Sequence, residues 1–224
     1  MQSFNRAGFM GALILGLSLI GYAVYELVLY PNAGLPTRDF AVILAAANTL
    51  RVGHVLKFGY ASGFALLTIF FFSHARDRSP VVAQLAVIAG AGASVLFAAS
   101  GLIGLNILSV AEQTFAAYRA EAETTILLRT VTIAVFEAAT SLAGLLVALN
   151  SLIDLRAKRL PLPLDLFGLL FGGMFVVKGL LPAEVMQAAA VLSIGWAFGL
   201  TFVLRSAQDR DQAKLRPSST LLED

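Results

Sequence analysis

A few ionisable side chains inside long apolar stretches limit the chemistry open to this chain. Glu137 lies about a dozen residues into an apolar stretch between Thr125 and Ile153, at a depth expected near the middle of a bilayer. A carboxylate in hydrocarbon needs a partner or a proton, and such residues often mark a functional site. The position predicts either a proton-titrating or substrate-binding carboxylate, or a protonated or paired one that joins helices.

The remaining candidates lie near the ends of apolar stretches, on the side expected to face outward. They are Glu26, Arg51, His54, Lys57, Arg129, Lys178 and Glu184. With Glu137 they form the candidate ligand-binding residues of an outward-facing polar cluster. The alternative is that lysine and arginine side chains extend to the interface and that Glu184, two residues after a proline, stabilises a helix start.

Most catalytic and cofactor chemistry is excluded by residue type. The chain has no cysteine, which excludes disulfides, iron–sulfur clusters and thiolate zinc sites. The two histidines, His54 and His74, lie about 30 Å apart along one expected helix, so they cannot be the paired axial ligands of one haem. Nucleotide-binding and hydrolase motifs are absent from the sequence. We expect no metal, no cofactor and no catalytic residue.

The composition indicates an integral membrane protein. Hydrophobic residues make up 58% of the 224 positions and charged residues only 13%, against about a quarter charged in soluble domains. The mean hydropathy is +0.81. A net charge of +2 is too small to indicate a nucleic-acid partner. We therefore expect an all-α polytopic bundle whose main partner is the lipid bilayer.

Hydropathy predicts about six spans in one bundle over residues 1–204, followed by a polar cytoplasmic tail at 205–224. The expected spans are 8–30, 52–73, 81–109, 126–150, 163–181 and 184–204. Residues 38–50 are too short to span alone and lie either at the interface or as an extension of the second span. The basic short loops 74–80 and 154–159 predict that both termini lie in the cytoplasm. We expect the protein in the inner membrane of the cell.

Small residues recur at four-residue spacing, as expected where helices pack closely in lipid. The positions are Ala86, Gly90, Ser94 and Ala98 in the third span, Gly168 and Gly172 in the fifth, and Gly195 and Gly199 in the sixth. This pattern favours a compact intramolecular bundle. The alternative is that one of these stripes binds a partner subunit.

Two segments resemble a family of six-span bacterial membrane proteins known only as a domain of unknown function. They are Leu50–Phe58, which opens the second span, and Leu155–Pro161 leading into Leu166–Leu170. The resemblance extends over nearly the whole length in span number and loop placement, and it implies the fold but no activity. This chain has Lys57 where the family tends to carry an acidic residue early in the second span.

Three functions follow as hypotheses. The first is a non-catalytic structural or accessory component of a membrane assembly, in contact with other membrane protein subunits. The second is a small-solute or proton-coupled transporter or binding protein that uses the outward-facing cluster. The third is a membrane enzyme acting on lipid or quinone, for which only His54 and Glu26 offer a base pair.

Overall fold

The computed structural model describes residues 2–36, 40–115, 122–158 and 160–215, and these form helices and turns without a strand. The all-α prediction is confirmed. The long helices are α1 Gln2–Val24, α4 Ala47–Ala75, α5 Pro80–Phe115, α6 Ala122–Ala157 and α8 Ala183–Leu215. Shorter helical segments are the π-helical turn η1 Tyr25–Leu29, α2 Tyr30–Asn32, α3 Phe40–Ala45, α7 Leu162–Val176 and the 3₁₀ turn η3 Lys178–Leu180.

Five helices of the described part are long and apolar enough to cross a membrane, as a multi-pass membrane protein requires. The candidate spans that they provide are Asn5–Asn32, Ala47–Ala75, Pro80–Gln113, Arg129–Ala157 and Ala183–Arg210. A helix satisfies its own backbone polar groups, which is why apolar segments of this length fold this way in lipid. The predicted fifth span corresponds to α7, which has only 15 residues and a length of about 22 Å, less than the ~30 Å hydrocarbon core.

Three boundaries differ from the sequence-based expectation. The segment 38–50 is not one element: Phe40–Ala45 forms the separate helix α3, Ala47–Leu50 belongs to α4, and residues 38 and 39 lie outside the described part. A position of α3 at the membrane interface stays a prediction. Helices α5 and α6 have 36 residues each, about 54 Å of helix, and so exceed the ~30 Å core. The polar segment after residue 204 continues α8 as far as Leu215.

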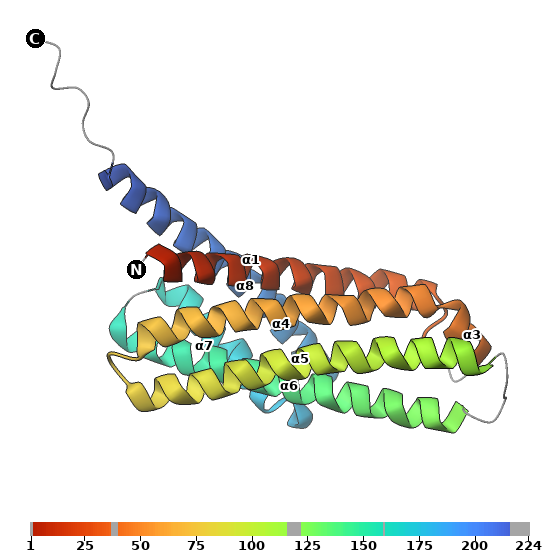
Figure 1. The fold of residues 1–224 in the computed structure, drawn as a ribbon. Helices are drawn as coiled ribbons and strands as arrows, with labels where there is room; N and C mark the ends of the chain where they lie inside the picture. Colours follow the sequence, from red (N-terminus) through yellow and green to blue (C-terminus); the bar gives the residue numbers. More distant parts are fainter. Residues whose placement is uncertain (1, 37–39, 116–121, 159, 216–224) are drawn as a thin grey trace, which may run out of the picture.

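The helices are arranged around the bundle in the order α1, α4, α5, α6, α7, α8, and α8 returns to α1 (Figure 1). Only in the half of the bundle that holds the start of α1 do all six of these helices pack together. There Gly16 of α1 lies against Phe198 of α8, and Gly172 of α7 against Gly144 of α6. Toward the other end α1 reaches α6 directly, because the rings of Tyr22 and Phe136 stack with centroids 5.6 Å apart. Four helices, α1, α4, α5 and α6, therefore enclose this second half.

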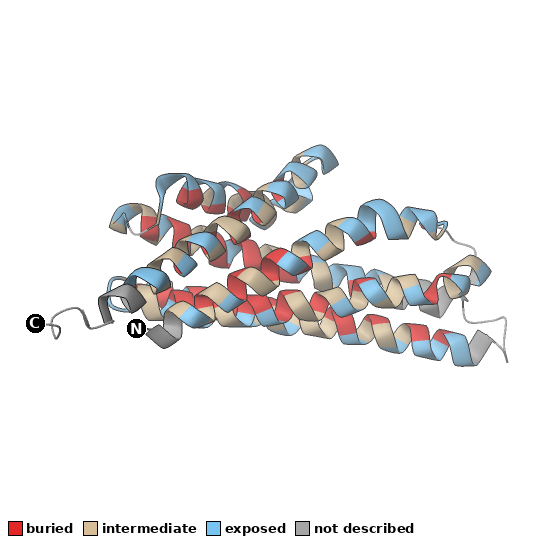
Figure 2. Cartoon of the chain, turned by 90° about the horizontal axis from the view of Figure 1, so that it is seen from above, coloured by how far each residue is buried: buried red, intermediate tan, exposed pale blue. Residues whose placement is uncertain are grey.

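The small-residue positions mostly lie at helix contacts inside the bundle, and Figure 2 shows that the buried residues gather where helices meet. A Cβ on Gly90 would lie 2.0 Å from Thr68 Oγ1 of α4. On Gly168 it would lie 2.2 Å from Ser151 Oγ, on Gly172 2.8 Å from the Gly144 oxygen, and on Gly199 2.9 Å from a Leu164 methyl. Ala86 is buried, Ala98 packs against the core, and the Ser94 hydroxyl donates to the Gly90 carbonyl. Gly195 has open space around it. These placements fit close intramolecular packing.

Candidate functional site

Lys57 is the central polar residue of the four-helix half. It is only 6% exposed on α4, and its Nζ donates to Ser100 Oγ of α5 at 3.0 Å. The Ser100 hydroxyl in turn donates to the Thr132 carbonyl oxygen of α6 at 3.0 Å. A chain of hydrogen bonds thus joins three helices in an otherwise apolar interior, where each bond is stronger than in water.

His54 lies one turn from Lys57 on the same helix face. Its Nδ1 is 3.3 Å from Lys57 Nζ, a contact in which the lysine donates when Nδ1 carries no proton. The imidazole fits against α5 because Gly104 has no side chain, since a Cβ there would lie 2.0 Å from His54 Cε1. Lys57 Nζ also lies 5.1 Å from the centre of the Phe136 ring, within the range of a cation–π interaction.

Aromatic rings surround this amine. Tyr60 stacks on Phe97 at 5.2 Å, and Phe97 meets Phe136 edge-on at 5.4 Å. Tyr22 touches both Tyr60, at 5.8 Å, and Phe136, at 5.6 Å. The rings come from α1, α4, α5 and α6, so they hold the four helices together around Lys57 and exclude water from it.

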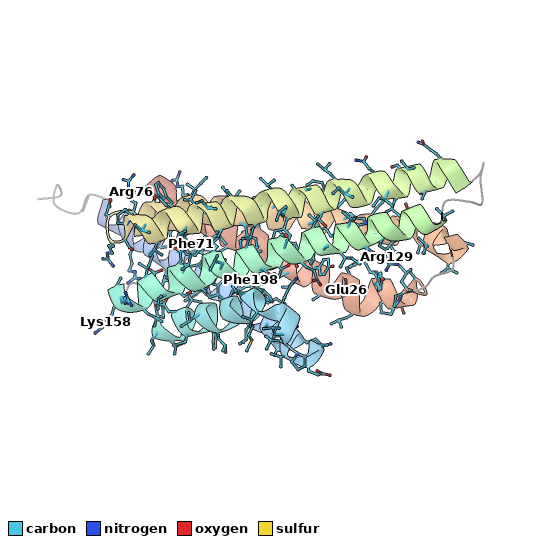
Figure 3. All side chains as sticks on the ribbon, turned by 90° about the horizontal axis from the view of Figure 1, so that it is seen from below. Glu26, Phe71, Arg76, Arg129, Lys158 and Phe198 are labelled. Carbon is cyan, nitrogen blue, oxygen red and sulfur yellow. The ribbon has the colours of Figure 1, made fainter. Side chains whose placement is uncertain are left out.

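Two further charges border the aromatic shell. Glu26 is exposed within the π-helical turn η1, is hydrogen-bonded through its side chain to Tyr22, and lies within electrostatic range of Lys57 and Tyr60. Arg129 Nη2 of α6 donates to the Tyr30 hydroxyl at 2.5 Å and lies within electrostatic range of His54. Figure 3 shows Glu26 and Arg129 in the same half of the bundle, away from Arg76 and Lys158.

We name these residues the Lys57 cluster: Glu26, His54, Lys57, Ser100 and Arg129. The cluster contains two basic side chains, Lys57 and Arg129, and one acidic one, Glu26, so the site carries an excess of positive charge when both basic side chains are protonated. Such an arrangement offers hydrogen-bond donors to a carboxylate or phosphate group. Groups of three or more metal-ligating side chains do not occur in the described part of the chain.

Four of the predicted site residues lie outside this cluster. Arg51 forms an ion pair with Glu112 of α5 and also donates to Asn48 at 2.8 Å. Lys178 lies 3.9 Å from Glu137, whose side chain is 59% exposed, so Glu137 faces outward from α6 beside the α7–α8 turn. Glu184 is exposed at the start of α8. The structure thus brings Glu26, His54, Lys57 and Arg129 together and separates the others.

The sequence reasoning missed the uncharged members of the site. Ser100, Tyr22, Tyr60 and Phe136 stand in apolar stretches with nothing in their own type to distinguish them. The spacing to a charged residue could have indicated two of them. Tyr22 precedes Glu26 by four residues and Tyr60 follows Lys57 by three, so each tyrosine lies on the same helix face as a charge.

A second buried polar group lies between α6, α7 and α8. Asp165 of α7 is 1% exposed, and its Oδ1 has no hydrogen-bond partner among the described residues. The same holds for the indole nitrogen of Trp196. Asp154, another buried carboxylate, lies within electrostatic range of Asp165.

No protein-family model, curated protein or solved structure matches the chain. The resemblance to the six-span bacterial family therefore stays a prediction.

Proposed function

We propose that this multi-pass membrane protein binds a small anionic solute at the Lys57 cluster, as the substrate site of a transporter or the ligand site of a binding protein. The basic turns 74–80 and 154–159, at the other end of the bundle, support an orientation with the cluster outward and both termini in the cytoplasm. The membrane that we propose is the inner membrane of the cell.

The observation that carries the proposal is the buried amine of Lys57. An ammonium group taken out of water normally has a carboxylate partner. Lys57 has a hydroxyl, an imidazole and a ring face instead, and none of the ion pairs between described residues includes it. A side chain in this position is costly for the fold alone, which supports a role in recognition.

The neighbouring groups define the ligand class. Arg129 offers a planar guanidinium suited to two-point contact with carboxylate or phosphate oxygens, and Tyr30 already orients it. Glu26, the exposed acidic member, lies on the α1 side of the cluster. We expect entry of the solute between α1 and α6, where Tyr22 and Phe136 close the shell by ring stacking.

The test is direct binding to protein in phosphatidylcholine nanodiscs. Succinate, acetate and inorganic phosphate are titrated separately and followed by calorimetry and by the melting temperature. We expect at least one of them to bind wild type and to lose that binding in Lys57→Met. Lys178→Met is the matched control, because Lys178 pairs with Glu137 outside the cluster. Equal binding by wild type and Lys57→Met, or no binding by wild type, would overturn the proposal.

A second candidate function is the accessory component of a membrane assembly. The supporting observation is the outer face of α8, where Gly195 has open space around it and Val191 and Phe202 are 68% and 73% exposed. A glycine between apolar side chains allows a partner helix to approach closely. Gentle purification from the native membrane tests this, and a monomer without any copurifying polypeptide counts against it.

A further inference from the structure

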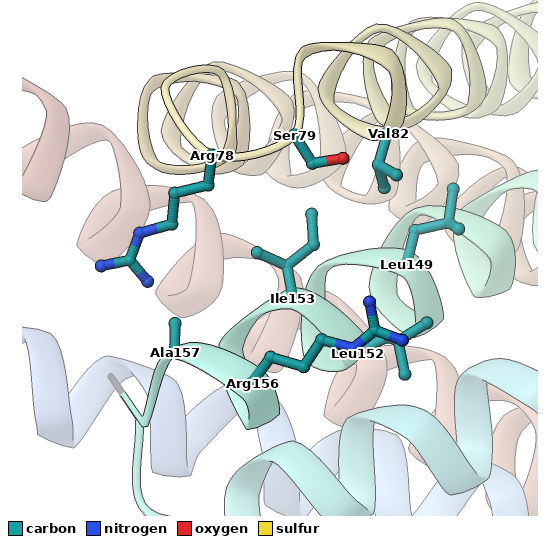
Figure 4. A pocket seen from close by; sticks show the side chains of 8 residues that line it. All are labelled: Arg78, Ser79, Val82, Leu149, Leu152, Ile153, Arg156 and Ala157. Carbon is teal, nitrogen blue, oxygen red and sulfur yellow. The ribbon is translucent and has the colours of Figure 1, made fainter.

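At the end of the bundle opposite the Lys57 cluster, α5 and α6 enclose a pocket of about 350 Å³. This volume lies within the range of about 300–1,000 Å³ of small-molecule sites. The pocket is lined by Arg78, Ser79, Val82, Leu149, Leu152, Ile153, Arg156 and Ala157. Figure 4 shows the two arginine side chains extending from different walls, Arg78 from the turn before α5 and Arg156 from α6.

The polar lining is cationic. Arg78 and Arg156 are both exposed, and neither forms an ion pair with any described residue. The acidic residue nearest in the turn, Asp77, is paired with Arg76 at 3.4 Å. Ser79 adds a hydroxyl directly before Pro80, the first residue of α5, where the free N–H groups of the helix start also favour an anion.

The apolar lining belongs to the membrane-facing side. Leu152 is 42% exposed. About one turn deeper than the pocket residues Val82 of α5 and Leu149 of α6, the side chains of Leu85 and Leu145 are 49% and 36% exposed. Arginines at the level of the helix ends therefore stand above side chains that face hydrocarbon. This is the order of groups along a phospholipid, with the phosphate at the interface and the acyl chains below it.

We propose that this pocket binds the headgroup of an anionic phospholipid, with the phosphate between Arg78 and Arg156 and the acyl chains along α5 and α6. Basic pockets between transmembrane helices at the cytoplasmic interface bind such headgroups in other membrane proteins. The site is independent of the Lys57 cluster, which lies in the other half of the bundle.

The experiment measures phosphatidylglycerol binding to protein in phosphatidylcholine nanodiscs, by titration and by native mass spectrometry of retained lipid. Arg78→Gln/Arg156→Gln is compared with Arg76→Gln/Lys158→Gln, which removes the same charge at the same end of the bundle (Figure 3) from residues outside the pocket. We expect the first variant to bind phosphatidylglycerol about 30-fold more weakly. Each arginine contributes ~1 kcal/mol to the binding free energy, and about 1.4 kcal/mol corresponds to a tenfold change in Kd. The control is expected to bind within about threefold of wild type.

Two further arms separate a lipid site from a general anion site. Val82→Trp fills the pocket and keeps both arginines, so it should lose phosphatidylglycerol as well. Glycerol phosphate and inorganic phosphate, which lack acyl chains, should not compete at comparable concentrations. Equal losses in the two double variants, full binding by Val82→Trp, or equal binding of free phosphate would each overturn the proposal.

Discussion

Replacing Lys57 by methionine should leave the protein as stable as the wild type or make it more stable. The change removes a charged hydrogen bond to Ser100, worth about 1.5–3 kcal/mol, and a cation–π contact with Phe136, worth about 0.5–2 kcal/mol. Against this, the wild type keeps an ammonium 6% exposed, and desolvating a buried ion costs on the order of several kcal/mol. A methionine of similar length packs in the same aromatic shell without that cost.

The balance predicts a free energy of unfolding unchanged or raised by up to about 2 kcal/mol, the direction found when buried ions give way to apolar side chains. At ~2–4 °C per kcal/mol for a chain of this size, the melting temperature should rise by 0 to about 8 °C. Trp196, the single tryptophan, is 1% exposed, so its fluorescence in nanodiscs reports unfolding of the core.

The companion variant Ser100→Ala should change the free energy of unfolding in the opposite direction and destabilise the protein. It keeps the lysine charge but removes its hydroxyl acceptor, which should cost about 1.5–3 kcal/mol. In the double variant Lys57→Met/Ser100→Ala most of this cost should disappear, because the unsatisfied ammonium is gone. If Lys57→Met proved destabilising by more than about 2 kcal/mol while Ser100→Ala was neutral, Lys57 would be a structural anchor and the reasoning from its burial would be refuted.

Three further predictions concern packing, the cluster border and topology. Gly172→Ala should destabilise the protein in thermal unfolding, since its Cβ would lie 2.8 Å from a backbone oxygen of α6, whereas Gly195→Ala has open space and should gain up to about 1 kcal/mol from helix propensity. Arg129→Gln and Tyr30→Phe should each lower the free energy of unfolding by a similar amount, about 1.5–3 kcal/mol. The double variant should lose little more, because both changes break the same hydrogen bond. Additive losses of stability would contradict this. Reporter fusions in the 154–159 loop should be cytoplasmic, and an extracellular signal would reverse the orientation.

Composition and hydropathy were enough to predict the helical class, because a chain with 13% charged residues has to satisfy its backbone inside lipid. Composition and hydropathy were less informative about the length of each helix. An apolar stretch such as 163–181 looks like a full span, but the helix ends at Val176, after which Lys178–Leu180 forms a 3₁₀ turn. The residues that follow Val176 also make contacts that no local pattern contains, such as that of Lys178 with Glu137, which lies far away in the sequence.

For the site, charge in an apolar context identified Glu26, His54, Lys57 and Arg129 but also residues that lie elsewhere. Glu137 looked like a buried group because it stands mid-span, yet its side chain is 59% exposed. Depth along a helix follows from the sequence, whereas the direction in which a residue faces depends on the rotation of the helix against its neighbours. Ser100 shows the converse, since only the packing of α5 between α4 and α6 makes it a partner of Lys57.

The π-helical turn of Tyr25–Leu29 sets the direction in which the residues after it, in α2, face relative to those of α1. Its ring is closed by the Tyr30 N–H donating to the Tyr25 carbonyl, five residues back rather than four, so the chain holds one residue more than an α-helix of the same rise would. Each residue turns a helix by about 100°. Removing one amino acid here would restore a regular helix and swing Tyr30 to another side, away from the guanidinium it orients. The extra residue of the turn thus allows Tyr22, before the turn, to stack on Phe136 and Tyr30, after it, to accept a hydrogen bond from Arg129.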